Sequence, residues 1–217
     1  MDFFSLHSAF IRRIHPENPQ SEIIFEAAER LIRGGVVAFP TRCLYGLGVD
    51  AFNFAALARV FEIKQRPVDK PLLVLIQNTR QLDRLVKYVP PFASRIMDNF
   101  WPGRVTVVFE AKESVPDILT AGTGKIGIRW AGHAVASALV NAAGRPITGT
   151  SANLSGRDGC CRIKDMDHRI LKHLDLILDA GPLKGGRGST VVDATASFPA
   201  VLREGEVSAA QIRALFD

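Results

Sequence analysis

Three cations lie close together in residues 64–72, which read KQRPVDKPL. Lys64, Arg66 and Lys70 could together hold a ligand that carries several negative charges. Arginine binds phosphate or carboxylate through two parallel hydrogen bonds, and lysine acts as a compact point charge. Fixed cations stabilise the charge that builds on phosphate oxygens during phosphoryl or nucleotidyl transfer. The segment therefore predicts a phosphate site, and a solvated basic loop is the alternative interpretation.

A second polar segment, residues 150–156 (TSANLSG), carries a serine and an asparagine two residues apart. Side chains at positions i and i+2 of an extended segment point to the same side. Ser151 and Asn153 can therefore face one ligand together. We expect both to face a nucleotide whose phosphates contact the cations of residues 64–72.

The elements on either side of the cations must hold them in place. Residues 54–63 repeat apolar side chains at helical spacing, which predicts a helix. Residues 72–76 are a continuous apolar run of the length of a strand. Pro67 and Pro71 stiffen the connection between this helix and this strand. The cations therefore lie on a rigid connection, and such connections commonly supply binding groups.

Strand and helix patterns alternate along the rest of the chain. Helices are expected from about residues 18–21 to the glycines at 34–35, and at residues 79–88, 91–100, 133–143, 166–174 and 208–216. Strands are expected at residues 36–39, 105–109, 125–130, 176–178, 189–193 and 200–203, with a turn-rich loop at residues 41–48. This alternation predicts an α/β fold with one mixed, twisted sheet, in which strands near the C-terminus pair antiparallel.

The composition is that of a globular chain with a large core: 217 residues, 47% hydrophobic and 23% charged. We expect one domain over residues 1–217, no membrane-spanning run and no signal peptide at the N-terminus. The three cysteines, two of them adjacent, make a poor disulfide framework, which favours the cytoplasm. The net charge of +5 favours anionic partners such as nucleotides or RNA.

Several common motifs are excluded. Gly46-x-Gly48-x-x-Ala51 has the glycine spacing of a dinucleotide-binding turn, but the acidic residue that should follow about 20 positions later is missing. Gly124-Lys125 lacks the rest of a phosphate-binding P-loop, and no G-x-S-x-G elbow occurs. No cysteine or histidine spacing is typical of zinc, so we expect no metal bound by side chains.

Four stretches, in chain order, resemble the YrdC-type threonylcarbamoyl-AMP synthase family: residues 39–48 (FPTRCLYGLG), 64–72, 150–156 and 189–193 (STVVD). WPGRVT at residues 101–106, GIR at 127–129 and LREG at 202–205 extend the resemblance over nearly the whole chain. The motifs most specific to this family are the K-x-R pair (Lys64 and Arg66) and the S-x-N pair (Ser151 and Asn153). HPENPQ at residues 15–20, together with LREG, also resembles the YciO branch, which tends to lose both pairs.

The resemblance implies a single-domain YrdC-like fold, in which helices and a twisted mixed sheet surround a large, positively charged cavity. It implies a nucleotidyltransferase that makes threonylcarbamoyl-AMP and pyrophosphate from L-threonine, bicarbonate or CO2, and ATP. Other proteins would then transfer the threonylcarbamoyl group to ANN-decoding tRNA. Mg²⁺ would be held mainly by the phosphates, since no carboxylate cluster is visible in the sequence.

The resemblance also assigns residues to the site. Lys64 and Arg66 would be catalytic, and we expect alanine at either position to abolish turnover and leave the fold intact. The nucleotide would contact Lys64, Arg66, Lys70, Lys125, Ser151, Asn153 and Arg203. The amino acid and the cavity floor would involve Thr41, Thr106, Arg129 and Ser189. Three of these have plainer interpretations: Thr106 as a strand residue, Lys125 as a solvated charge, and Ser189 as a partner of backbone groups.

Five positions depart from the usual family pattern. Arg42 stands where an acid is common, and Cys43 stands where a second threonine is common. Leu75 replaces a histidine, Gly149 replaces a serine, and Ala131 replaces the proline of R-x-P. All five changes lie toward the amino-acid end of the site. The sequence therefore supports adenylate formation more strongly than it supports threonine as the amino acid.

Two other functions stay open. A YciO-branch protein without synthase activity could bind double-stranded RNA or tRNA through its phosphates, with strong salt dependence that ATP does not alter. A carbamoyl-adenylate activity occurs in the YrdC-like domain of hydrogenase maturation proteins. Those proteins carry further domains and cysteine-rich zinc motifs, which this sequence lacks.

Overall fold

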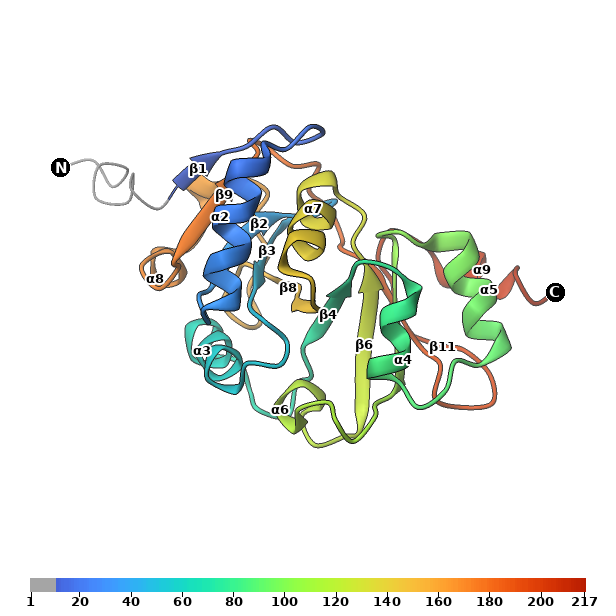
Figure 1. Cartoon of the computed structure of the whole chain (residues 1–217). Helices are drawn as coiled ribbons and strands as arrows, with labels where there is room; N and C mark the ends of the chain where they lie inside the picture. The colour runs from blue at the N-terminus through green and yellow to red at the C-terminus, as the bar shows by residue number, and fades with distance from the viewer. Residues whose placement is uncertain (1–10) are drawn as a thin grey trace.

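The computed structural model describes residues 11–217, and the expectation about a signal peptide falls largely on residues 1–10, outside this range. The chain forms a mixed α/β fold with β1 at one end of the molecule and α9 at the other (Figure 1). Across the described range, no helix is both long enough and apolar enough to span a bilayer.

One sheet has five strands in the order β1-β9-β2-β3-β8. Its strands are β1 (Ile11–Arg13), β9 (Leu176–Asp179), β2 (Val37–Pro40), β3 (Tyr45–Gly48) and β8 (Thr150–Ser151). The pairs β1/β9 and β9/β2 are parallel, whereas β2/β3 and β3/β8 are antiparallel. We call this the first sheet.

The second sheet has six strands in the order β11-β10-β5-β6-β4-β7. Its strands are β11 (Ala200–Arg203), β10 (Thr190–Asp193), β5 (Val105–Glu110), β6 (Lys125–Trp130), β4 (Leu73–Ile76) and β7 (Ile147–Thr148). The pairs β10/β5 and β6/β4 are parallel, and the other three pairs are antiparallel. The expected antiparallel pairing near the C-terminus is therefore confirmed for β10 and β11.

The prediction of one sheet is wrong, because β2 and β4 do not share a sheet. β4 pairs instead with β6 and β7, so the order β2–α3–β4 does not form a β-α-β unit. The turn-rich loop expected at residues 41–48 is also partly wrong, because β3 occupies its second half. Gly48 makes this hairpin possible, since a Cβ atom there would lie 2.7 Å from the ring of Phe39.

Two helices cover the first sheet. α2 (Ser21–Ile32) and α7 (Ala134–Ala143) lie side by side, and both contact β2 (Figure 1). Together with Phe39, Leu75 and Leu178 they enclose a small apolar core of their own. The larger core runs through both sheets and contacts α3 (Phe54–Lys64).

The remaining helices are α4 (Leu82–Leu85), α5 (Pro91–Phe100), α6 (Asp117–Thr120), α8 (His168–Leu171) and α9 (Ala209–Arg213), with 3₁₀ turns at Thr79–Gln81 and Ile163–Asp165. Several are shorter than the sequence predicts. The helix expected at residues 79–88 ends early because Val86 is extended and bridges to Ala111. The helix expected at 166–174 starts late because Met166 is extended and Asp167 caps the first turn.

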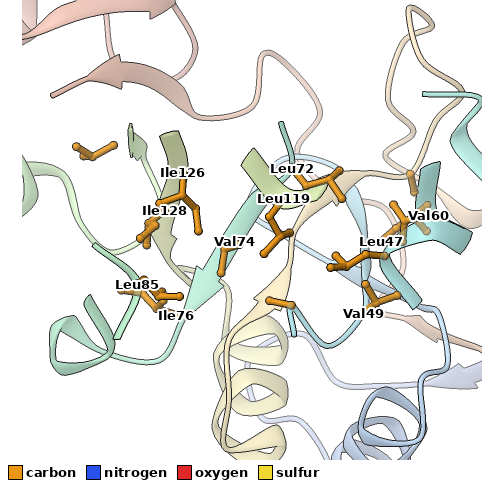
Figure 2. Close-up of a cluster of buried hydrophobic side chains, with 14 of the residues drawn as sticks. Leu47, Val49, Val60, Leu72, Val74, Ile76, Leu85, Leu119, Ile126 and Ile128 are labelled. Atoms are coloured by element: carbon orange, nitrogen blue, oxygen red, sulfur yellow. The ribbon is translucent and has the colours of Figure 1, made fainter. Parts of the chain in front are cut away.

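Residues 147–151 belong to both sheets. Ile147 and Thr148 pair with β4, and two residues later Thr150 and Ser151 pair with β3. Gly149 is the crossing point, and its amide donates to the carbonyl of Leu73 at 2.9 Å. Figure 2 shows part of the larger core, with apolar side chains from both sheets and from α3, α4 and α6. The seam fixes how the two sheets face each other.

Candidate functional site

A cavity of about 760 Å³ lies between the two sheets. One wall comes from residues 41–46, around the β2–β3 turn, and from residues 149–153 of the seam. The other wall comes from β5, β6, β10 and β11 of the second sheet. Its ionisable side chains include seven cations and four acids. The cavity therefore favours an anionic ligand.

Ser151 and Asn153 both line the cavity, while the intervening Ala152 is buried on the other side. The Ser151 hydroxyl donates to the Oδ1 atom of Asn153. The Asn153 amide nitrogen donates to the carbonyl of Leu154 at 2.8 Å. These bonds hold the two polar groups against one edge of the cavity, in the alternation that the sequence predicts.

Lys64 is only 1% exposed and is not among the residues that line the cavity. Its Nζ atom donates to the carbonyl of Ser151, to the carbonyl of Asn153 at 2.6 Å and to the Asn153 Oδ1 at 3.5 Å. The carbonyl of Lys64 also accepts from the amide of Ser155 at 2.8 Å. Burial, with a smaller effect of the nearby Arg66, lowers the pKa of Lys64 to about 7. The structure thus joins the K-x-R and S-x-N segments through the lysine itself.

Arg66 lines the cavity, and Lys70 does not. The Arg66 guanidinium donates to the carbonyls of Lys70 at 3.0 Å and Pro71 at 2.7 Å, so it braces its own loop. Burial lowers the pKa of Arg66. The Lys70 side chain is exposed on the outer side of this loop. Of the three cations that the sequence brings together, only Arg66 reaches the cavity.

Thr106 and Ser189 lie against each other on neighbouring strands, with their hydroxyl oxygens 2.8 Å apart. Both are buried, and both line the cavity. Thr41 lines it from the opposite wall, where its hydroxyl donates to the carbonyl of Leu44 at 2.7 Å. Thr41, Thr106 and Ser189, three of the residues predicted to contact the amino acid or the cavity floor, therefore line the same cavity.

Lys125 and Arg203 also line the cavity, and each has a partner there. Lys125 forms an ion pair with Asp193, with 3.0 Å between Nζ and Oδ2. Arg203 donates to the carbonyl of Ser189 at 2.8 Å. Asp193 is the last residue of the STVVD segment, and its bonds to Thr195 and Lys125 outweigh burial and lower its pKa.

Arg129 is the unusual cation of the cavity. It is 8% exposed, yet within residues 11–217 its guanidinium makes no hydrogen bond and no ion pair. Burial and the charge of Arg203 lower its pKa to about 10. Its nitrogens keep some access to the hollow, since Ser155 Oγ alone is a fully buried side-chain N or O atom without a partner among the described residues, so the donors of Arg129 are available to a ligand. An anionic ligand at this position would supply the missing partner.

Near Arg129, Arg42 forms an ion pair with Glu206. The Arg42 Nε atom lies 3.0 Å from one Glu206 oxygen, and Nη2 lies 3.2 Å from the other. The pair links the β2–β3 turn to the segment after β11, so it connects the two walls. Cys43, beside Arg42, is buried, and burial together with the Glu206 carboxylate raises its pKa.

Seven charged residues of the cavity were not predicted as site residues: Arg42, Arg157, Asp158, Arg187, Asp193, Glu204 and Glu206. Arg157 follows the TSANLSG segment directly, and Arg187 lies in the glycine-rich stretch before STVVD. Their positions next to these two segments could have identified them as site candidates from the sequence. Glu206 directly follows LREG, but the sequence could not show its ion pair, since its partner Arg42 is 164 residues away.

Comparisons with known proteins identify the family of the chain. Residues 29–205 match the Sua5/YciO/YrdC family model, which carries the description "Telomere recombination". The chain belongs to the Sua5/YciO/YrdC family. A threonylcarbamoyl-AMP synthase of Pyrococcus abyssi is 37% identical over 179 residues, which are 82% of this chain and 53% of that protein. This chain therefore spans about half the length of that relative.

Other members of the family are similar over more of their length. The uncharacterized protein YciO of Escherichia coli is 34% identical over 194 residues, covering 88% of this chain and 93% of YciO. Among solved structures, P. abyssi Sua5 complexed with L-threonine has a TM-score of 0.90 and 34% identity. The match covers 94% of this chain and 60% of that one. The expected YrdC-like fold is thus confirmed.

Two departures from the family pattern explain each other. A Cβ atom at Gly149 would lie 2.6 Å from the Cγ atom of Leu75 and 2.9 Å from its Cδ1 atom. Leu75 is buried in the small core and is not among the cavity residues. It therefore fills the space that a serine side chain at position 149 would need. These two changes concern packing behind the cavity wall, rather than a contact with the amino acid.

Proposed function

We propose that this chain is a threonylcarbamoyl-AMP synthase, which forms L-threonylcarbamoyladenylate and pyrophosphate from L-threonine, bicarbonate or CO2, and ATP. In this reaction a carbamate oxygen attacks the α-phosphate of ATP, and pyrophosphate leaves. The relatives named threonylcarbamoyl-AMP synthase support the assignment, as does the likeness to a Sua5 structure that contains L-threonine. The activity would make the protein a nucleotidyltransferase.

The observation that carries the proposal is the unpartnered, buried guanidinium of Arg129. A carboxylate of an amino acid is a suitable partner, because arginine binds carboxylates in a planar, bidentate way. The paired hydroxyls of Thr106 and Ser189 line the same hollow and can orient the bound molecule. This end of the cavity suits the amino acid.

The nucleotide would lie toward Ser151 and Asn153, which bring neutral hydrogen-bonding groups to the cavity edge. Arg66, Lys125 and Arg203 would contact the phosphates. Negative charge increases on the phosphate oxygens in the transition state, and preorganised cations stabilise it without having to move. Lys64 would act as a positioning residue, because its bonds hold the Ser151–Asn153 edge in shape.

Magnesium would enter with ATP. Among the described residues, no group of three or more His, Cys, Asp or Glu side chains could hold a metal ion. The cavity acids Asp193 and Glu206 are already paired with cations. Phosphate oxygens and water are ordinary ligands of Mg²⁺, so the protein need not supply a cage of its own.

The product would be used in the cytoplasm by proteins that transfer the threonylcarbamoyl group to ANN-decoding tRNA. The reaction can be tested by measuring pyrophosphate release with each substrate omitted in turn. We expect release only when ATP, L-threonine and bicarbonate are all present. Release that does not need threonine, or that prefers another amino acid, would overturn the substrate assignment.

A matched pair of variants on one loop sharpens this test. Arg66→Met should reduce pyrophosphate release strongly, whereas Lys70→Met should not, because only Arg66 reaches the cavity. Equal effects of the two changes would indicate general loss of basic charge. No pyrophosphate release, combined with salt-sensitive RNA binding that excess ATP leaves unchanged, would favour the RNA-binding alternative.

A further inference from the structure

Glu206 brings a carboxylate to a cavity in which cations predominate. Its side chain is 12% exposed, and both of its oxygens accept hydrogen bonds from Arg42. A carboxylate has about four acceptor sites, so two bonds from one arginine leave room for further donors. Arg42 therefore fixes the carboxylate in place without filling all of its acceptor sites.

The other acids of the cavity have different surroundings. Asp193 is paired with Lys125 and accepts from Thr195. Glu204 accepts from the amide of Ala209 at 2.7 Å. Asp158 is exposed and follows the TSANLSG segment, on the wall opposite the second sheet. Glu206 is thus the one of these four acids whose carboxylate is held from the opposite wall, by Arg42.

Hydrogen bonds place Glu206 at the end of the cavity that holds Thr106, Arg129 and Ser189. The backbone amide of Glu206 donates to the carbonyl of Gly188 at 3.0 Å, and the hydroxyl of the adjacent Ser189 lies 2.8 Å from that of Thr106. Burial lowers the pKa of Arg129, and the charges of Cys43 and Glu206 act in the opposite direction. Glu206 acts on the pKa of Cys43 as well. A cation that needs a partner and an anion with spare acceptor sites therefore lie at the same end of one hollow.

A free amino acid carries one carboxylate and one ammonium group. We propose that Glu206, held by Arg42, binds the ammonium group of the amino acid whose carboxylate Arg129 binds. The inference rests on the proposed function, and it adds a specificity residue on the segment after β11. It predicts that this chain distinguishes an amino acid from the matching 2-hydroxy acid.

The test is isothermal titration calorimetry of the full chain with L-threonine and with 2,3-dihydroxybutanoate, which keeps the carboxylate and lacks the ammonium group. Glu206→Gln should weaken threonine binding about ten- to a hundredfold, as for loss of a charge-assisted hydrogen bond. The same variant should leave binding of the hydroxy acid within about twofold. Glu204→Gln, close by on the same segment, should leave both unchanged.

The charge-swapped variant R42E/E206R distinguishes two roles of Glu206: binding the ammonium group, and joining the two walls through its ion pair with Arg42. It can rebuild an ion pair between the two walls, but it places a cation where the ammonium group should bind. We therefore expect threonine binding to stay weak. Recovery of threonine binding, or equal weakening of threonine and the hydroxy acid by Glu206→Gln, would overturn the inference.

Failure of the proposed function gives a different result. If the wild-type chain binds ATP and no amino acid, both the function and this inference fail. If wild-type binds threonine and Glu206→Gln binds it equally well, the inference alone fails. ATP affinity should be the same in wild-type and Glu206→Gln, and this measurement also shows that the variant is folded.

Discussion

Lys64→Met should destabilise the protein, although the sequence alone predicts an intact fold. Methionine has a similar length but no donor, so the carbonyls of Ser151 and Asn153 would lose the hydrogen bonds that Nζ makes with them. The carbonyl of Ser151 would keep its bond from the amide of Asn153 at 2.9 Å, whereas the carbonyl of Asn153 would lose its partner. A buried acceptor left without a partner costs about 1–3 kcal/mol, and a lost hydrogen bond costs about 1 kcal/mol. We expect a loss of about 2–4 kcal/mol in the free energy of unfolding at pH 9.

The loss should depend on pH in a defined direction. Burial lowers the pKa of Lys64 to about 7 in the folded chain, against about 10.4 in the unfolded chain. Between these values the unfolded state binds more protons, so wild-type stability rises with pH by about 1.4 kcal/mol per unit from this group. Lys64→Met lacks this contribution. The difference between the two proteins should therefore shrink as the pH falls from 9 to 7.

Urea unfolding of both proteins at pH 7, 8 and 9 measures this difference. Lys70→Met is the matched control, because Lys70 lies on the same loop and is exposed. Its stability should stay within about 0.5 kcal/mol of wild-type at each pH. A Lys64→Met loss that is constant from pH 7 to 9 would show that the lysine stays charged when buried. No loss at pH 9 would refute the bracing role.

Two further predictions concern packing and thiols. Gly149→Ala should lower the free energy of unfolding by about 1–3 kcal/mol, because the new methyl group meets Leu75. The double variant L75A/G149A should lower it by less than the sum of the two single changes. Additive costs in thermal unfolding would contradict the shared space. Iodoacetamide at pH 8 should modify Cys161 first, because Cys43 and Cys160 are buried and burial raises the pKa of Cys160 to about 11. Peptide mass mapping that found Cys160 modified first would be inconsistent with this burial.

Local patterns predicted the longest elements well. The helix expected at residues 54–63 is α3, and the strand expected at 125–130 is β6. Apolar periodicity is a local property, so it shows in a short window of sequence. Strand pairing is not local. β4 follows α3 directly, yet its partners come from residues 125–130 and 147–148, and no local signal distinguishes two sheets from one.

The same contrast holds for the site. Spacing alone predicted that Ser151 and Asn153 share a face, because extended segments alternate strictly. Spacing could not show that Lys64 is buried behind the Ser151–Asn153 edge instead of lining the cavity, since this depends on oxygens that lie 87 and 89 residues further along the chain. Glu206 was missed for the same reason. Its role depends on Arg42, which the sequence shows only as a departure from the family pattern.

The seam at residues 147–151 has a consequence for how the chain tolerates change. β7 and β8 are each two residues long, and one glycine separates them. Side chains alternate along extended backbone, so one inserted residue between Thr148 and Thr150 would reverse the faces of the side chains that directly follow it. Ser151 and Asn153 would then turn inward and Ala152 would face the hollow. Length at this point is therefore under tighter constraint than residue type.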